Sequence, residues 1–177
     1  VANALLIQQQ SLNFPVALDQ MGAQLHFFNM EARQRIELPG KNGTLIVTAG
    51  ELNHPGSCFG YRFEYGSGKK ARTFVFATDT EHYDRPNPNL QELARGADVL
   101  LYDAQFTPEE YAGFVGGGHS TWQAGLRECS AAGVKRLLLT HHDPLRDDWA
   151  LARIETDARQ EGRKLGIEVA AAREGME

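Results

Sequence analysis

Several polar residues in this chain have types and positions suited to metal chemistry. His54, Asp79, Asp103 and His141 each follow an apolar stretch that is expected to form a strand. Strand ends at one edge of a sheet converge in space, so imidazoles and carboxylates from different strands can surround a cation. Neutral imidazole suits zinc, iron and manganese, and a carboxylate can bridge two cations. These properties make His54, Asp79 and His141 the candidate metal ligands.

A further histidine, His119, follows the glycines at 116–118 and precedes Ser120 and Thr121, which can cap a helix. Spacing alone leaves simpler interpretations open. Asp79 could cap its own turn, Asp103 could do the same before a helix, and each histidine could be an ordinary turn or core residue.

Segments rich in Val, Leu, Phe, Thr and Tyr, separated by clusters of Gly, Asn and Pro, indicate the strands that must position these side chains. The expected strands are residues 24–29, 43–49, 58–65, 72–78, 99–103, 134–140 and 167–172. The expected helices are residues 1–10, 89–95, 108–112 and 121–132, followed by a last helix that begins near 147–148. Hairpins together with strand–helix–strand units predict an α/β sandwich with helices on a mixed sheet.

Composition narrows the possible functions. The chain has 42% hydrophobic and 23% charged residues, and its net charge is −5. This acidity argues against a phosphate-backbone grip, so nucleic acid is not an expected partner. No apolar run reaches the roughly 20 residues that span a bilayer, which excludes a membrane partner and favours a cytoplasmic location. Cys58 and Cys129 lie far apart and are expected to be core residues.

Five motifs in order resemble the metallo-β-lactamase superfamily. They are Leu52-Asn53-His54-Pro55-Gly56 with Gly60-Tyr61-Arg62, Ala77-Thr78-Asp79-Thr80, Tyr102-Asp103-Ala104-Gln105-Phe106, Gly118-His119-Ser120-Thr121 and Leu139-Thr140-His141-His142. The resemblance runs from about residue 14 to residue 143. It is strongest to the phosphodiesterase branch, which contains ribonuclease Z and the cyclic phosphodiesterase of phosphonate breakdown.

The resemblance implies an αββα sandwich and a metal-dependent hydrolase, specifically a phosphodiesterase with a metal-activated water. It implies that His54, Asp79 and His141 are metal ligands, with Asp79 bridging two divalent ions of zinc, manganese or iron. His119 is implied to be a proton donor or phosphate contact, and Asp103 to orient it. His142 is the weaker ligand candidate.

The chain departs from the family pattern in one respect. The HxHxDH motif is absent, because no two of the six histidines have HxH spacing. We therefore expect residues 1–177 to form a single metallo-β-lactamase-like domain that lacks its N-terminal part and is inactive or impaired in isolation. Its exposed sheet face is expected to associate with the missing N-terminal half or a second chain, as in a homo-oligomer.

Two alternatives to a small-molecule phosphodiesterase stay open. One is a tRNA 3′-end processing endonuclease, and the other is a non-catalytic binding or regulatory module. Among the remaining residues, we expect Glu81 and His82 to lie on a solvated loop. Trp122 and Trp149 are expected to pack in the core.

Overall fold

The computed structural model describes residues 2–10, 12–41 and 43–176 and divides the chain into two compact units, Val1–Glu31 and Ala32–Glu177. The first unit contains helix α1 (Ala2–Gln8) and a short 3₁₀ helix (Leu18–Gln20). The predicted helix at residues 1–10 is therefore present in part, with residue 1 outside the described residues.

The strand predicted at residues 24–29 is wrong, because this exposed segment, which contains His26, has no regular structure. A strand depends on hydrogen bonds to a neighbouring strand, and its local apolar pattern does not supply them.

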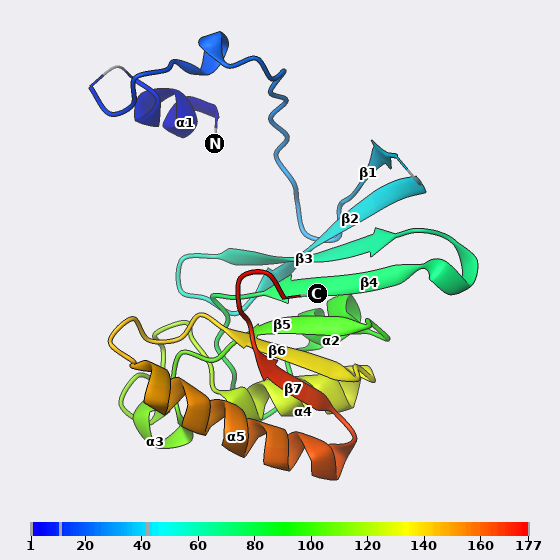
Figure 1. Ribbon diagram of the computed structural model, residues 1–177, viewed down its shortest axis with the longest axis vertical. Helices are drawn as coiled ribbons and strands as arrows, with labels where there is room; N and C mark the ends of the chain where they lie inside the picture. The colour runs from blue at the N-terminus through cyan, green and yellow to red at the C-terminus, as the bar shows by residue number, and fades with distance from the viewer. Residues whose placement is uncertain (1, 11, 42, 177) are drawn as a thin grey trace. The chain divides into compact units, whose positions relative to one another are not determined.

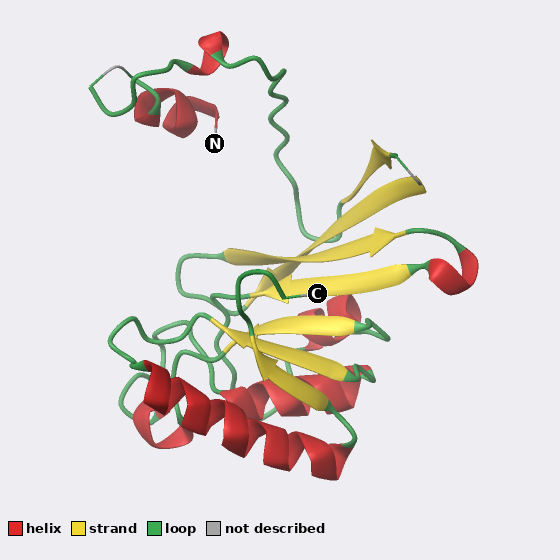
Figure 2. Cartoon of the chain, in the orientation of Figure 1, coloured by secondary structure: helices red, strands yellow, loops and turns green. Residues whose placement is uncertain are grey.

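The second unit is built on one mixed sheet whose strand order follows the chain (Figures 1 and 2). The strands are β1 (Arg35–Gly40), β2 (Gly43–Leu52), β3 (Cys58–Tyr65), β4 (Arg72–Ala77), β5 (Val99–Asp103), β6 (Arg136–Thr140) and β7 (Glu168–Ala171). Strands β1 to β4 pair antiparallel, and β4 to β7 pair parallel. The predicted mixed α/β architecture is confirmed.

Strand β1 was not predicted from the sequence. Its segment carries Glu37 and Pro39, which are both depleted in strands. It nevertheless pairs with β2, with Ile36 opposite Val47. Its position at the edge of the sheet explains why proline is tolerated there.

Helices cover one face of this sheet (Figure 1). They are α2 (Pro88–Ala94), α4 (Trp122–Ala132) and α5 (Asp148–Leu165), whereas the short helix α3 (Pro108–Tyr111) buries none of its residues. All four helices lie close to the predicted ranges. The side chains of Asn87, Thr121 and Asp147 cap α2, α4 and α5 by accepting backbone N–H groups. These caps satisfy donors that a helix leaves unpaired in its first turn.

The core lies between the sheet and these helices. Val75, Leu100 and Leu137 are fully buried in the cluster that also contains Leu90 and Cys129. Burial of such side chains contributes about 1.5–3 kcal/mol each. Trp122 packs there as predicted. The prediction for Trp149 is wrong, because Trp149 lies at the start of α5 and is 83% exposed.

The opposite face of the sheet is also apolar. Phe76 is paired in register with Leu101, which pairs with Leu138, and residues paired in this way share a face. Leu101 and Leu138 are half-buried, and Phe76 is 39% exposed. Successive side chains of a strand point to opposite faces. The residues next to these three along the strands, such as Val75, Leu100 and Leu137, belong to the helix-covered core, so Phe76, Leu101 and Leu138 lie on the other face.

Among the described residues, no helix is both long and apolar enough to cross a membrane.

Glu128 offers a test of how burial affects stability. It is 2% exposed on α4, accepts the Asn87 N–H at 2.9 Å, and contacts the Gln91 side-chain amide. Burial raises the pKa of Glu128, so the folded state favours its protonated form. Its contribution to stability is therefore fully present below the unfolded-state pKa and is lost as pH rises through the folded-state pKa.

We expect Glu128→Gln to be at least as stable as wild type at pH 8, and the two unfolding free energies to converge as pH falls toward the ordinary pKa of 4.5. Urea unfolding across this pH range measures the difference in unfolding free energy between the two proteins. The contributions of the other carboxylates are common to both proteins and cancel in this difference. A wild-type advantage that grows with pH would contradict the expectation.

Candidate metal centre

The candidate site is organised by Asp103, at the end of β5, whose side chain is fully buried. Its Oδ2 atom lies 2.9 Å from Nδ1 of His119 and 3.2 Å from Nδ1 of His141. The same oxygen accepts the Asp79 N–H at 3.0 Å. One carboxylate oxygen thus contacts three of the predicted site residues. The contact with His141 was not predicted from the sequence.

The other carboxylate oxygen of Asp103 holds the surrounding backbone. Oδ1 accepts the N–H groups of Gln105 and Ser120, both at 3.1 Å. The hydroxyl of Ser120 in turn donates to the Thr80 carbonyl at 2.5 Å. An ionised carboxylate can compensate its burial with several hydrogen bonds of this kind. Asp103 therefore connects the loops that follow β4 and β5 with the start of α4.

This arrangement determines which ring nitrogens remain available. A carboxylate acts as an acceptor, so His119 and His141 donate Nδ1–H to Asp103 and leave Nε2 with a free lone pair when neutral. Metal-binding histidines usually have such a carboxylate partner. The two ring centroids are 4.8 Å apart. Both histidines therefore have the environment of a ligand or a proton-transfer group.

Asp79 and His141 share an unusual backbone conformation. Their φ angles are 55° and 57°, in the left-handed region that residues other than glycine rarely adopt. This conformation costs about 1–2 kcal/mol per residue, so the surrounding contacts must maintain it. The Thr78 hydroxyl donates to Oδ2 of Asp79 at 2.9 Å, which leaves Oδ1 facing His141.

The separation between Asp79 and His141 fits a shared cation. Oδ1 of Asp79 and Nε2 of His141 are 3.6 Å apart, beyond the usual hydrogen-bond range. Two ligand atoms that are each about 2 Å from a tetrahedral zinc ion lie about 3.3 Å from one another. The observed distance is close to that value, and both side chains are partly exposed.

His54 lies in the turn after β2, and its Nδ1 atom accepts the Gly56 N–H at 3.2 Å. The neutral ring therefore carries its proton on Nε2, and binding of a cation there would release it. The ring of His54 meets that of His119 edge-on, with centroids 5.7 Å apart. His54 therefore lies beside the residues organised by Asp103.

The structure groups the predicted residues differently from the predicted ligand set. Potential ligand atoms of His54, Asp79 and His119 lie within 4.8 Å of one another, as do those of Asp103, His119 and His141. His119 belongs to both groups, whereas His54 and His141 share none. The donor types suit zinc, iron or manganese, so the residues present fit a divalent metal.

Glu81 is a site residue that the sequence analysis missed. The predicted solvated loop is wrong for this residue, which is 2% exposed. Oε1 accepts the Gly116 N–H at 2.6 Å and the Tyr111 hydroxyl at 2.8 Å, and Oε2 accepts the Gly118 N–H at 3.0 Å. Burial acts to raise the pKa of Glu81, but these hydrogen bonds outweigh it and lower the pKa.

Two further histidines lie near these residues. His82 is half-buried and packs its ring against Tyr111, with centroids 4.1 Å apart. His142, the weaker ligand candidate, is also half-buried, and burial lowers its pKa. Both rings are therefore favoured in their neutral form, because desolvation disfavours the charged imidazolium.

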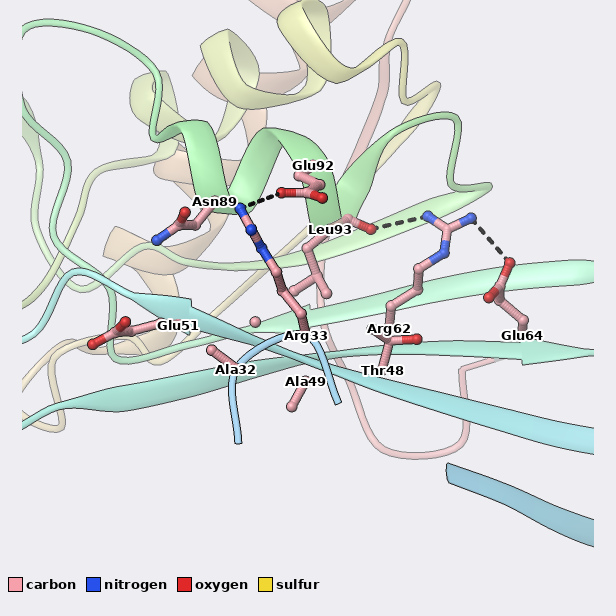
Figure 3. A pocket seen from close by; sticks show the side chains of 11 residues that line it. Ala32, Arg33, Thr48, Ala49, Glu51, Arg62, Glu64, Asn89, Glu92 and Leu93 are labelled. Atoms are coloured by element: carbon pink, nitrogen blue, oxygen red, sulfur yellow. Dashed lines mark hydrogen bonds and ion pairs between the residues drawn. The ribbon is translucent and has the colours of Figure 1, made fainter. Parts of the chain in front are cut away.

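A cavity of about 580 Å³ lies away from the candidate metal centre, between α2 and strands β2 and β3 (Figure 3). Four of its charged side chains form two ion pairs: Arg33 contacts Glu92 at 3.1 Å, and Arg62 contacts Glu64 at 3.2 Å. Arg62 also donates to the carbonyls of Leu93 and Arg95 at the end of α2. A cation is favourable at a helix C-terminus, so these contacts have a structural explanation.

Comparisons with known proteins agree with the predicted family. The sequence model of a family described as Beta-lactamase superfamily domain matches residues 6–142. Ribonuclease Z of Brevibacillus brevis is 36% identical over 83 residues, which are 47% of this chain and 25% of that protein. The chain therefore spans about a quarter of the length of this curated relative.

Two solved structures share the fold. The metallo-β-lactamase fold protein YhfI from Bacillus subtilis aligns with a TM-score of 0.62 and 22% identity, over 84% of this chain and 54% of that one. The short form of human tRNase Z, ELAC1, aligns with a TM-score of 0.53 and 21% identity, over 78% of this chain and 44% of that one.

The contact between Gly118 and His54 can be tested with a pair of substitutions. A Cβ atom at Gly118 would lie 2.3 Å from Cδ2 of His54, whereas one at Gly116 would meet nothing within 4 Å. The two glycines have similar φ angles, 91° and 88°, so the same backbone strain applies to both substitutions.

We expect Gly118→Ala to be about 1–3 kcal/mol less stable than Gly116→Ala, which is a typical cost of overpacking. Urea unfolding measures the difference, and the NMR signals of the His54 ring should shift only in Gly118→Ala. Equal stabilities with an unchanged His54 signal would contradict the contact.

Proposed function

Because this chain belongs to the Beta-lactamase superfamily domain family, we propose that it carries part of the active site of a metal-dependent phosphodiesterase. The observation that supports this most directly is the buried Asp103 carboxylate shared by His119, His141 and the Asp79 amide. A purely structural carboxylate would not require two imidazoles with free Nε2 atoms beside another carboxylate. The activity is proposed for the whole protein.

We assign His54, Asp79 and His141 as the residues that hold divalent metal in the complete protein, where two ions of zinc, manganese or iron are proposed. When bound, such ions lower the pKa of water toward neutrality and polarise the phosphate. The open Oδ1 of Asp79 and the Nε2 lone pair of His141 support this assignment. Asp103 fixes the ring of His141 through Nδ1.

His119 is proposed to be the proton donor. Its Nδ1–H is held by Asp103, whose negative charge supports a positively charged ring. Protonated Nε2 can then transfer its proton to the departing oxygen of the phosphate ester, which would otherwise leave as a poor alkoxide. The ring of Phe106 lies edge-on to the His119 ring, with centroids 6.3 Å apart.

A tRNA 3′-end processing reaction is the second candidate. Its support comes from curated relatives named ribonuclease Z and from the fold shared with human tRNase Z. Against it stands the net charge of −5, since RNA binding is favoured by basic surfaces. Cleavage of a precursor tRNA, in the absence of hydrolysis of a small aryl phosphodiester, would favour this candidate.

The open face of the sheet supports a proposal about partners. Phe76, Leu101 and Leu138 form an apolar surface that the helices do not cover. Further polypeptide, either more of the same protein or a second copy, is proposed to pack against it in the active form. Apolar surfaces of this kind commonly mark interaction sites.

Removal of His119 tests the proton-donor role. We expect His119→Ala to lower kcat of the whole protein about 10²–10⁴-fold on an aryl phosphodiester with manganese or zinc, while bound metal stays constant. Steady-state kinetics and elemental analysis give the two readouts. Loss of metal together with activity would instead assign His119 as a ligand, and equal rates would remove its catalytic role.

Metal binding can be measured without turnover. We expect Asp79→Asn and His141→Ala to weaken zinc binding at least about tenfold, because each removes a ligand, whereas His26→Ala has no effect. His26 lies in the first unit and is exposed, so it is a matched control. Calorimetric titration measures the affinities, and a whole protein that binds no metal would favour a non-catalytic module.

A further inference from the structure

Glu81 is held in place by its backbone as well as by its side chain. Its N–H donates to the Asn53 carbonyl at 2.6 Å, and the Asn53 side-chain amide donates back to the Glu81 carbonyl at 3.4 Å. Asn53 immediately precedes His54, and Glu81 lies two residues after Asp79. The carboxylate therefore extends from a backbone position that connects the loops bearing two candidate ligands.

The side chain of Glu81 contacts a third loop. Oε1 accepts hydrogen bonds from the Gly116 N–H and the Tyr111 hydroxyl, and Oε2 accepts one from the Gly118 N–H. The same Tyr111 hydroxyl lies 2.8 Å from the His82 carbonyl, so its single proton is shared between two acceptors. The carboxylate is thus satisfied by three donors, which compensates its almost complete burial.

The loop that Glu81 holds leads directly to the candidate metal centre. Gly118 adopts a φ of 91° and packs so closely on His54 that a Cβ atom would collide with the ring. The next residue is His119, whose ring is held by Asp103. A displacement of Gly118 would therefore disturb His54 by contact and His119 through the chain.

We propose that Glu81 is a positioning residue that anchors the 116–118 loop and so sets the placement of His54 and His119. Its importance for catalysis rests on the proposed function, because it acts through His119. Glu81 contacts neither of these rings directly and is proposed to act through the amides of Gly116 and Gly118.

The chemistry of the contacts predicts an asymmetric effect of Glu81→Gln. A glutamine offers one oxygen, and placing it at the position of Oε1 keeps both the Gly116 amide and the Tyr111 hydroxyl. The side-chain NH₂ group then faces the Gly118 N–H, and two donors cannot pair. Gly118 is therefore the amide expected to lose its partner.

Amide hydrogen exchange on the metal-free chain tests the anchor. In Glu81→Gln we expect exchange at Gly118 to accelerate at least about tenfold, since a hydrogen bond to a charged group is lost, with a smaller change at Gly116. The ring signals of His54 and His119 should shift. Glu128→Gln is the matched control, because it makes the same substitution at another buried carboxyl group that accepts a backbone N–H, and it should leave these signals unchanged.

Unchanged exchange at Gly118, or equal effects of Glu81→Gln and Glu128→Gln on the two rings, would overturn the proposal. If Glu81→Gln does not fold, wild-type protein still provides a test. Scalar couplings across the hydrogen bonds should connect the amide nitrogens of Gly116 and Gly118 to the Glu81 carboxylate carbon, and their absence would refute the anchor.

Kinetics of the whole protein separates this proposal from the proposed function. With an active wild type, Glu81→Gln should lower kcat more than it changes KM, and an unchanged kcat would overturn the positioning role. With an inactive wild type, the proposed function fails, and the exchange rates and ring signals of the metal-free chain still decide whether Glu81 sets the two histidines.

Discussion

The need to satisfy one buried carboxylate, that of Asp103, constrains the candidate site. A charge removed from water is tolerated only with several hydrogen bonds, and the chain supplies them from separate segments. Backbone amides after β4 and β5 and at the start of α4 converge on it, together with the rings of His119 and His141. The loops that carry the polar groups are therefore held together by the same acceptor that orients those groups.

Glu81 is a second buried carboxylate that is satisfied by hydrogen bonds from a distant segment of the chain. Its carboxylate accepts the N–H groups of Gly116 and Gly118, which lie in a loop and have no partner from a helix or strand. The glycines are needed for different reasons, since Gly116 only adopts a positive φ whereas Gly118 also approaches the ring of His54. Asp103 thus contacts Asp79, His119 and His141 directly, whereas Glu81 is linked to His54 through the backbone of Asn53 and through Gly118.

The sheet supplies the rigidity that this arrangement requires. Asp79 and His141 have strained backbones within two residues of the ends of β4 and β6, and β5 lies between these strands in the sheet. Parallel strands place their carboxyl ends at one edge, where short segments can be held in uncommon conformations. Helices α2, α4 and α5 cover one face of the sheet, and Phe76 on the opposite face is 39% exposed.

Periodic apolar segments and ordered polar motifs in the sequence were sufficient to predict the family, most elements and the residues that gather around Asp103. Local patterns failed where long-range pairing decides: residues 24–29 have strand-like composition but no strand partner, and β1 forms despite Pro39 because β2 pairs with it. The burial of Glu81 could not be read from its neighbours, since its donors lie about 30 to 37 residues away. Sequence determines which chemical groups are present, whereas tertiary structure decides which donors reach each buried acceptor, because hydrogen bonds depend on distances of a few ångströms that sequence spacing does not specify.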